Sequence, residues 1–280
     1  MINDKILKSI ENLPAFPATV QKVSGLLGDP DYSIPELVGV IEYDQAITAN
    51  ILRMCNSAYF GVRYKISTVR EAVAYLGREN LVRVVSAAGI SRYYNKVNGY
   101  YQEATRLWEH SVGVAIMSLI LSKRIYNRAD SSLFTVGLLH DVGKVVLGEF
   151  VLDSFQQIMD LVTNHQYSFL EAEEEVIGIN HAEVGAKIAL LWNFPQELQD
   201  AILYHHRPDL MTEGDSSISW LVYLADQACM MMGIGGGADG LAYRGLREVV
   251  DRFKLRQRDF EECIVELLND LENAKELLSL

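Results

Sequence analysis

The sequence predicts an all-α protein built as a multi-helix bundle. Apolar residues recur at spacings of three and four along most of the chain, which is the period of an amphipathic helix. Alternating Val/Ile segments long enough to form a buried strand are scarce. The chain has 280 residues, of which 49% are hydrophobic, so it can bury a large core without disulfides or a structural metal.

The first predicted helices lie between residues 18 and 94. The helix over 18–29 is stopped by Gly28 and the Asp29-Pro30 pair that follows it. Ser33 and Glu36 form a capping-box pattern that opens the next helix, over 34–44. Asn56 and Ser57 are favoured in caps and turns, so they are expected to stop one helix and orient the next segment. Further helical periods cover residues 46–56, 69–77 and 79–94.

A polar stretch over residues 93–104, rich in Asn and Tyr, separates these helices from a second set. It divides the chain into an expected N-terminal helical lobe, 1–95, and a second helical lobe, 96–280. The glycine-rich segment 233–240 lacks the Lys-Ser/Thr of a phosphate-binding loop, so it is interpreted as a linker. Helical periods in the second lobe, besides two amphipathic C-terminal segments, cover 107–125, 131–150, 155–165, 181–194, 197–206 and 217–232.

Composition restricts the compartment and the partners. Three cysteines, Cys55, Cys229 and Cys263, lie far apart without a CxxC pair, which indicates a reducing compartment. The N-terminus has no signal-peptide core, and no apolar run reaches the ~18–20 residues that span a bilayer. A net charge of −12 disfavours a phosphate-backbone contact surface. The sequence therefore predicts a cytoplasmic protein that binds neither nucleic acid nor membrane.

Ionisable residues occupy helices that otherwise look apolar. Burying such a group without a partner costs several kcal/mol, so these residues are expected to need each other or an ion. Taken singly, each has an ordinary interpretation, such as a hydrogen-bonded histidine in a helix or a buried Asp226 paired with Arg53 or Arg83. Five of the six histidines share this placement, which favours a common site. The candidate residues are His110, His140, Asp141, His181, His205, His206 and Asp226.

Helical geometry predicts how some of these side chains meet. On a helix, His140 and Lys144 share a face, whereas Asp141 is turned by about 100° and reaches the same site only from the helix edge. Pro208 disfavours helical geometry just before it, so the His205-His206 pair is expected at a helix C-terminus. Both rings can reach one site from that position.

The remaining chemical residues have simpler interpretations. The acidic cluster of Glu171, Glu173, Glu174 and Glu175 is expected on the solvated face or first turn of a helix. The three tryptophans, Trp108, Trp192 and Trp220, are expected in the core. His165 has polar neighbours and is expected to be exposed.

The segments WEHSVGVA, LLHDVGK, NHAEVGA, YHH and LAD resemble the successive motifs of HD-superfamily metal-dependent phosphohydrolases. The region from LPAFPATVQ through NSAYFG to AVAYLG resembles the N-terminal part of HDOD domains. Together the two resemblances cover residues 13–232. The segment HHRPDLMTEGD stands where the related HD-GYP phosphodiesterases carry a Gly-Tyr-Pro segment, which makes cyclic-dinucleotide hydrolysis a less favoured alternative.

The resemblance implies a ligand set. The HD pattern maps a first metal onto His110, His140, Asp141 and Asp226, and the HD-GYP pattern maps a second onto His181, His205 and His206. Seven nitrogen and oxygen ligands without a thiolate exceed a tetrahedral zinc site and fit two ions bridged by Asp141. Fe or Mn is favoured, with Zn or Ni as alternatives.

Two functions follow from the resemblance. The first is a signalling protein that docks a protein partner and carries a structural or regulatory metal. The second is a metal-dependent phosphohydrolase or phosphodiesterase that acts on a nucleotide or cyclic dinucleotide. In the second, Asp141 holds the metal and Lys144 stabilises phosphate charge; the alternative for Lys144 is an ion pair with an acid such as Glu149. The first is favoured because few basic residues accompany the ligand set.

Overall fold

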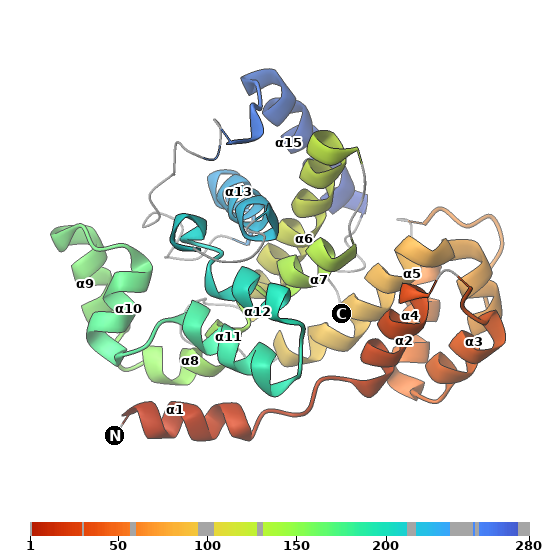
Figure 1. The fold of residues 1–280 in the computed structure, drawn as a ribbon, viewed down its shortest axis with the longest axis horizontal. Coiled ribbons are helices and arrows are strands. Elements are labelled where there is room, and N and C mark those ends of the chain that lie inside the picture. The colour runs from red at the N-terminus through yellow and green to blue at the C-terminus, as the bar shows by residue number, and fades with distance from the viewer. Residues whose placement is uncertain are drawn as a thin grey trace. The chain divides into compact units, whose positions relative to one another are not determined.

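The computed structural model of the chain describes residues 2–29, 31–56, 60–94, 104–127, 131–211, 217–235, 249 and 252–273. Every regular element among these residues is helical, as the sequence predicts (Figure 1). No helix in this part of the chain is both long and apolar enough to cross a membrane. Residues 95–103 of the predicted boundary segment, residue Ser57 and residues 236–240 of the glycine-rich segment lie outside the described residues.

The chain divides into two compact units. One unit contains residues 14–92 and 268–280, and the other contains residues 1–13 and 93–267. The helices that belong wholly or mainly to the smaller unit are α2 (Ala18–Gly28), α3 (Ile34–Glu42), α4 (Gln45–Cys55) and α5 (Val69–Tyr94).

Local signals explain the helix boundaries of the smaller unit. The Ser33 hydroxyl accepts the Glu36 backbone N–H, which caps α3. Gly77 takes a left-handed conformation with φ of 66°, which kinks α5 between the two segments that the sequence separates. Asn56 follows α4; its side chain donates to the carbonyl of Ile66 and accepts that residue's N–H. Asn56 therefore fixes the segment that leads into α5.

The larger unit holds the remaining helices. They are α1 (Ile2–Glu11), α6 (Ala104–Tyr126), α7 (Ser131–Leu139), α8 (Gly143–Val151), α9 (Phe155–His165), α10 (Phe169–Ile177), α11 (His181–Leu191), α12 (Gln196–Leu203), the short 3-10 turn Pro208–Leu210, α13 (Ser217–Met231) and α15 (Gln257–Asn273). The last of these runs beyond residue 267 into the residues assigned to the smaller unit.

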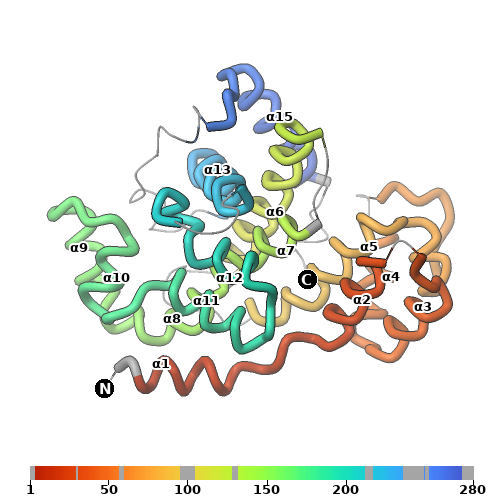
Figure 2. The backbone as a smooth tube through the Cα atoms, in the orientation of Figure 1, coloured from red at the N-terminus to blue at the C-terminus, as the bar shows by residue number. Residues whose placement is uncertain are grey.

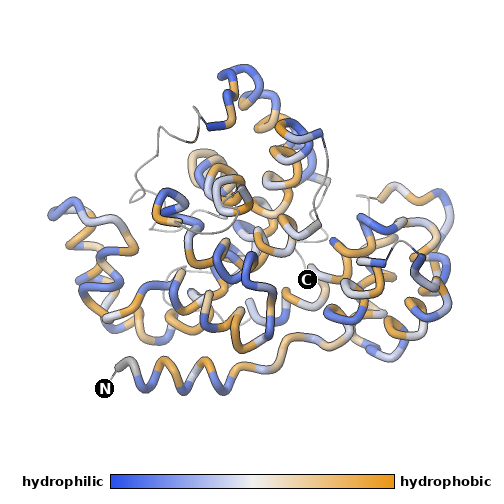
Figure 3. Tube along the Cα trace, viewed as in Figure 1, coloured by the Kyte–Doolittle hydropathy of each residue, from blue (hydrophilic) through white to orange (hydrophobic). Residues whose placement is uncertain are grey.

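Helix α6 forms the centre of the larger unit. It packs along α7 and α13, and α11 packs against both α8 and α12 (Figure 1). The trace in Figure 2 shows α9 and α10 as an antiparallel pair at the edge of this unit. Helix α1 alternates apolar and polar residues (Figure 3) and buries Ile6 and Ile10, on the side that contacts α8 and α11. The predicted core residues Trp108, Trp192 and Trp220 are all buried.

The segment over residues 131–150 differs from the sequence prediction. It forms two helices, and the residues from His140 to Val142 make the turn between them. The Val142 N–H bonds to the carbonyl of Leu139, and the Lys144 N–H bonds to that of Asp141. The turn, rather than one face of a continuous helix, therefore presents the His140-Asp141 pair.

Candidate metal centre

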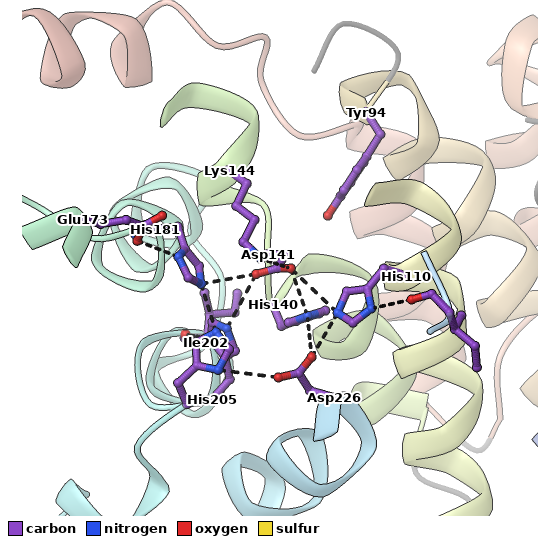
Figure 4. Close-up of polar contacts among 12 residues, drawn as sticks. Tyr94, His110, His140, Asp141, Lys144, Glu173, His181, Ile202, His205 and Asp226 are labelled. Carbon is purple, nitrogen blue, oxygen red and sulfur yellow. Dashed lines mark hydrogen bonds and ion pairs between the residues drawn. The ribbon is translucent and has the colours of Figure 1, made fainter. Parts of the chain in front are cut away.

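The structure brings all seven candidate residues of the larger unit together (Figure 4). They come from α6, the turn after α7, the first residue of α11, the segment after α12, and α13. Each is buried, with a relative exposure of 7% or less. The residues are His110, His140, Asp141, His181, His205, His206 and Asp226.

Asp141 lies between two groups of ligand atoms. In one group, atoms of Asp141, His181, His205 and His206 all lie within 4.8 Å of one another, and in the other so do atoms of His110, His140 and Asp141. Its Oδ1 is 3.4 Å from Nε2 of His181, and its Oδ2 is 3.4 Å from Nε2 of His140. The two carboxylate oxygens therefore face different sets of histidines, as a bridging ligand requires.

Asp226 closes the side formed by α13. Its Oδ1 lies 2.9 Å from Nε2 of His110, and its Oδ2 lies 3.5 Å from Nδ1 of His206. Asp226 thus has histidine partners within its own unit, while Arg53 contacts Asn50 and Arg83 contacts Asn80 and Glu79.

Two of the histidines cap the helix that they follow. The Nδ1 of His140 lies 2.7 Å from the carbonyl oxygen of Gly137, and that of His205 lies 2.6 Å from the carbonyl oxygen of Ile202. The last carbonyls of a helix lack an intrahelical partner, so these rings satisfy them. This bond also places the proton on Nδ1 and turns the Nε2 lone pair towards the site.

Two further histidines, which lie within helices, also have Nδ1 next to an oxygen acceptor. The Nδ1 of His110 lies 3.2 Å from the carbonyl oxygen of Ile234, and that of His181 lies 2.7 Å from Oε2 of Glu173. Nε2 of His181 faces Nε2 of His206 at 3.0 Å. If Nδ1 of His181 holds its proton against Glu173, its Nε2 is an acceptor pointing into the cluster.

Several of these buried atoms make no hydrogen bond within the described part of the chain. They are Nε2 of His140, Oδ1 of Asp141, Nε2 of His205 and Oδ2 of Asp226. An unsatisfied buried polar atom normally costs about 1–3 kcal/mol, so four that converge suggest a site for a cation. Imidazole nitrogen and carboxylate oxygen suit a divalent transition metal, so the residues present fit such an ion.

Lys144 is the one buried ammonium of the site. It is 1% exposed, and its Nζ donates to Oδ2 of Asp141 at 2.8 Å. An ion pair was one of the two predicted roles, but the suggested partner, Glu149, is exposed and the partner observed is Asp141. Burial alone would raise the pKa of Asp141, but Lys144 and His140 outweigh it and hold that pKa well below its usual range.

The charges on the α6 side of the site are also coupled. Burial lowers the pKa of His110, but the hydrogen bond to Asp226 and the charge of that carboxylate outweigh it, so the pKa is raised overall. The pKa of Asp226 is lowered in return, because contact with His110 outweighs burial. Contact with Asp226 therefore favours the protonated ring of His110 more than water does.

Glu173 is a residue that sequence reasoning assigned wrongly. It is fully buried, and its Oε2 accepts the backbone N–H of His181 at 2.8 Å and contacts Nδ1 of the same residue. Its neighbours Glu171, Glu174 and Glu175 are exposed, as predicted. The burial of Ala172 and Ile177 on the same helix is the tertiary feature that separates Glu173 from them.

A pocket of about 550 Å³ lies beside the cluster. His206 contributes to its lining, together with apolar side chains and the carboxylates of Glu171, Glu174 and Glu183. Burial and the nearby Glu174 raise the pKa of Glu183. The arginine of this pocket, Arg207, pairs with Asp209 at 3.0 Å. The side chains around the pocket therefore favour a cation over a phosphate.

His165 lies apart from the site. Its side chain is 59% exposed and lies 3.6 Å from Asp160, as expected for the one histidine with polar neighbours.

A family model described as the HDOD domain matches residues 13–208 of the chain. A curated relative from Treponema pallidum (strain Nichols), named as an uncharacterized protein, is 24% identical over 202 residues. The match covers 72% of this chain but only 39% of that protein, so the chain spans less than half the length of the relative.

Three solved structures share the fold. An HDOD domain protein of unknown function from Geobacter sulfurreducens matches with a TM-score of 0.76 and 26% identity, over 99% of this chain and 95% of that one. A candidate signal transduction protein from Marinobacter aquaeolei VT8 matches with a TM-score of 0.74 and 20% identity, over 100% of this chain and 66% of that one. A candidate phosphohydrolase from Shewanella amazonensis SB2B matches with a TM-score of 0.71 and 21% identity, over 97% of each chain. At these identities the last two support the helical fold alone.

Proposed function

The chain belongs to the HDOD domain family, and from that premise we propose that it is a signal-transduction protein that acts through protein–protein contacts and carries a divalent-metal centre. The smaller unit would dock the partner, and the larger unit would hold the metal. The domain boundary that we propose stays between residues 95 and 96, close to the break at residues 92–93 between the two compact units.

The metal centre would use all seven converging residues. His181, His205 and His206 would hold one ion, His110, His140 and Asp226 a second, and Asp141 would bridge them. The two oxygens of Asp141, each facing its own histidines, support this division. Fe or Mn suits this ligand set best, with Zn or Ni as alternatives. When bound, such an ion lowers the pKa of a coordinated water towards 7.

The position of Lys144 is the observation that favours a signalling function over hydrolysis. Its ammonium is buried against Asp141, so it is not presented to a phosphate that approaches from solvent. The pocket beside His206 adds three carboxylates, Glu171, Glu174 and Glu183, where a nucleotide would bring further negative charge. A closed, histidine-rich cluster is compatible with a metal that stabilises the fold rather than one that turns over a phosphoester.

The proposed partner is an acidic protein segment. Between Arg53 and Arg92 the chain has seven basic and two acidic residues, although its net charge is −12. Tyr64, 86% exposed, lies next to the exposed Arg63 and Lys65, and Arg and Tyr side chains are enriched in the centres of protein interfaces. This basic segment of the smaller unit is therefore the proposed docking surface.

The second candidate is a metal-dependent phosphohydrolase. The observation that favours it is that two groups of candidate ligands share Asp141. Two adjacent ions can stabilise both the attacking and the leaving oxygen of an in-line phosphoryl displacement. In that case Lys144 would have to leave Asp141 to reach a phosphate.

One experiment tests both candidates. The protein is prepared anaerobically with Fe and Mn supplied, its metal content is measured, and it is screened against phosphoesters and cyclic dinucleotides. Bound metal without turnover supports the signalling function, and turnover that Asp141→Ala abolishes supports the hydrolase. Protein that stays metal-free under these conditions contradicts the metal centre.

A further inference from the structure

We propose that Glu173 is a positioning residue that fixes the His181 ring with its Nε2 turned into the metal centre, and that it thereby ties helix α10 to that centre. The inference rests on the metal centre proposed above. It adds a residue that holds no metal itself and lies on a different helix from the ligand it orients.

Glu173 makes two contacts to one residue of the site, His181. Its Oε2 accepts the backbone N–H of His181 and faces the Nδ1 of the same ring, at 2.8 and 2.7 Å. Both side chains are 0% exposed. Since His181 is the first residue of α11, its N–H has no intrahelical acceptor and Glu173 supplies one. One carboxylate oxygen therefore satisfies the helix end and sets the ring at the same time.

The bond also fixes the tautomer. A carboxylate is an acceptor only, so the ring must carry its proton on Nδ1 to bond with Glu173. The Nε2 of His181 then keeps its lone pair, 3.4 Å from Oδ1 of Asp141 and 3.0 Å from Nε2 of His206. His110, His140 and His205 achieve the same orientation with backbone carbonyls. His181 differs from them because its acceptor carries a charge, which makes the ring a stronger metal ligand.

The position of Glu173 extends the influence of the metal to the edge of the larger unit. Helix α10 packs against α9 and α11 and carries Glu173 towards His181 (Figure 4). Because binding and ordering are coupled in both directions, metal binding should hold α10 in place, and displacement of α10 should weaken the metal. Glu175, exposed on the same helix, offers a matched position without this contact.

The test compares Glu173→Gln with Glu175→Gln and with the unaltered protein. Affinity for Mn²⁺ is measured by calorimetry, and the visible spectrum of the Co²⁺-loaded protein reports the ligand geometry. We expect Glu173→Gln to weaken Mn²⁺ binding by about 10- to 100-fold and to change the Co²⁺ spectrum, as loss of an orienting partner typically does. Glu175→Gln should match the unaltered protein in both. Amide exchange in α10 should slow on metal addition in the unaltered protein and much less in Glu173→Gln.

The outcomes separate this inference from the proposed function. Equal affinity and equal spectra for Glu173→Gln and Glu175→Gln, in protein that binds metal, overturn the role of Glu173 and leave the metal centre intact. Unaltered protein that binds no metal overturns both. If Glu173→Gln does not fold, the nitrogen chemical shifts of the His181 ring in the unaltered metal-free protein decide. The Nδ1–H tautomer supports the inference, and the Nε2–H tautomer overturns it.

Discussion

The ammonium nitrogen of Lys144 lies 2.8 Å from Oδ2 of Asp141, and each side chain is 1% exposed. Removing one member of a buried ion pair leaves the other charge without compensation, which is strongly destabilising. The same oxygen of Asp141 also faces Nε2 of His140 at 3.4 Å. Lys144 therefore acts as an internal cation at the proposed metal centre, and the stability of the metal-free protein should depend on it.

We predict that Lys144→Met lowers the free energy of unfolding of the metal-free protein by about 3–5 kcal/mol. Urea denaturation in the presence of chelator measures this change. Lys187→Met, at an exposed position of α11, is the control and should stay within about 0.5 kcal/mol. A metal-free Lys144→Met protein as stable as the control would show that the pair contributes nothing.

Asp141→Asn should abolish metal-dependent stabilisation. Metal at 100 times its dissociation constant should stabilise the unaltered protein by about 2.7 kcal/mol, because the ion binds only the folded state. Asp141→Asn leaves Lys144 buried beside a neutral group, so the single variant should also be destabilised without metal. The double variant Asp141→Asn, Lys144→Met should recover part of that loss and still gain nothing from metal. Melting curves with and without chelator distinguish these effects, and a metal-induced rise in the double variant would exclude Asp141 as the bridging ligand.

The sequence predicted the helices where local chemistry decides their ends. The hydroxyl of Ser33 caps α3 at the predicted position, and α12 ends at Leu203, ahead of the His205-His206 pair as Pro208 indicates. The ionisable residues of apolar helices could also be found from sequence, because burial forces such groups to find partners. Their convergence in the structure follows from that same constraint.

The sequence could not predict the features that depend on packing between helices. No proline interrupts this segment and its glycine, Gly137, lies inside α7 rather than at its end, so a continuous helix was predicted where α7 ends. Glu173 lies among three exposed glutamates, and nothing local to the chain distinguishes it from Glu174. Only the approach of α10 to the start of α11 gives Glu173 its partner, His181. Tertiary contacts decide both cases.

The contribution of His110 to stability should depend on pH. In the metal-free protein its pKa is raised, so the extra stability of the protonated ring beside Asp226 is fully present below the unfolded value of about 6.5. It is lost as pH rises through the raised folded pKa. The stability difference between the unaltered protein and His110→Gln should therefore be largest near pH 6 and shrink towards pH 9, a range that lies above the lowered pKa of Asp226.

Urea denaturation at several pH values with chelator present measures this difference. With metal bound the trend should reverse, because the ion requires the deprotonated ring and binds more weakly as pH falls. A difference that grows with pH in the metal-free protein would contradict protonation of His110 in the folded state.

Gly143, the first residue of α8, lies directly against the backbone of α11. A Cβ at this position would overlap the backbone carbonyl oxygen of His181 and lie 2.8 Å from the backbone nitrogen of Gly185. Both obstacles are backbone atoms, so α8 and α11 would have to separate. We predict that Gly143→Ala lowers the free energy of unfolding by about 1–3 kcal/mol and weakens metal binding, since Asp141 and His181 would move apart.

Gly39→Ala is the control. Gly39 lies in the exposed interior of α3, and a Cβ there would meet nothing within 4 Å, so this change should raise the free energy of unfolding by about 0.5–1 kcal/mol. Urea denaturation measures the two opposite changes in stability, and calorimetry measures the affinity of each variant for Mn²⁺. Unchanged metal affinity in Gly143→Ala would show that the centre tolerates separation of α8 and α11.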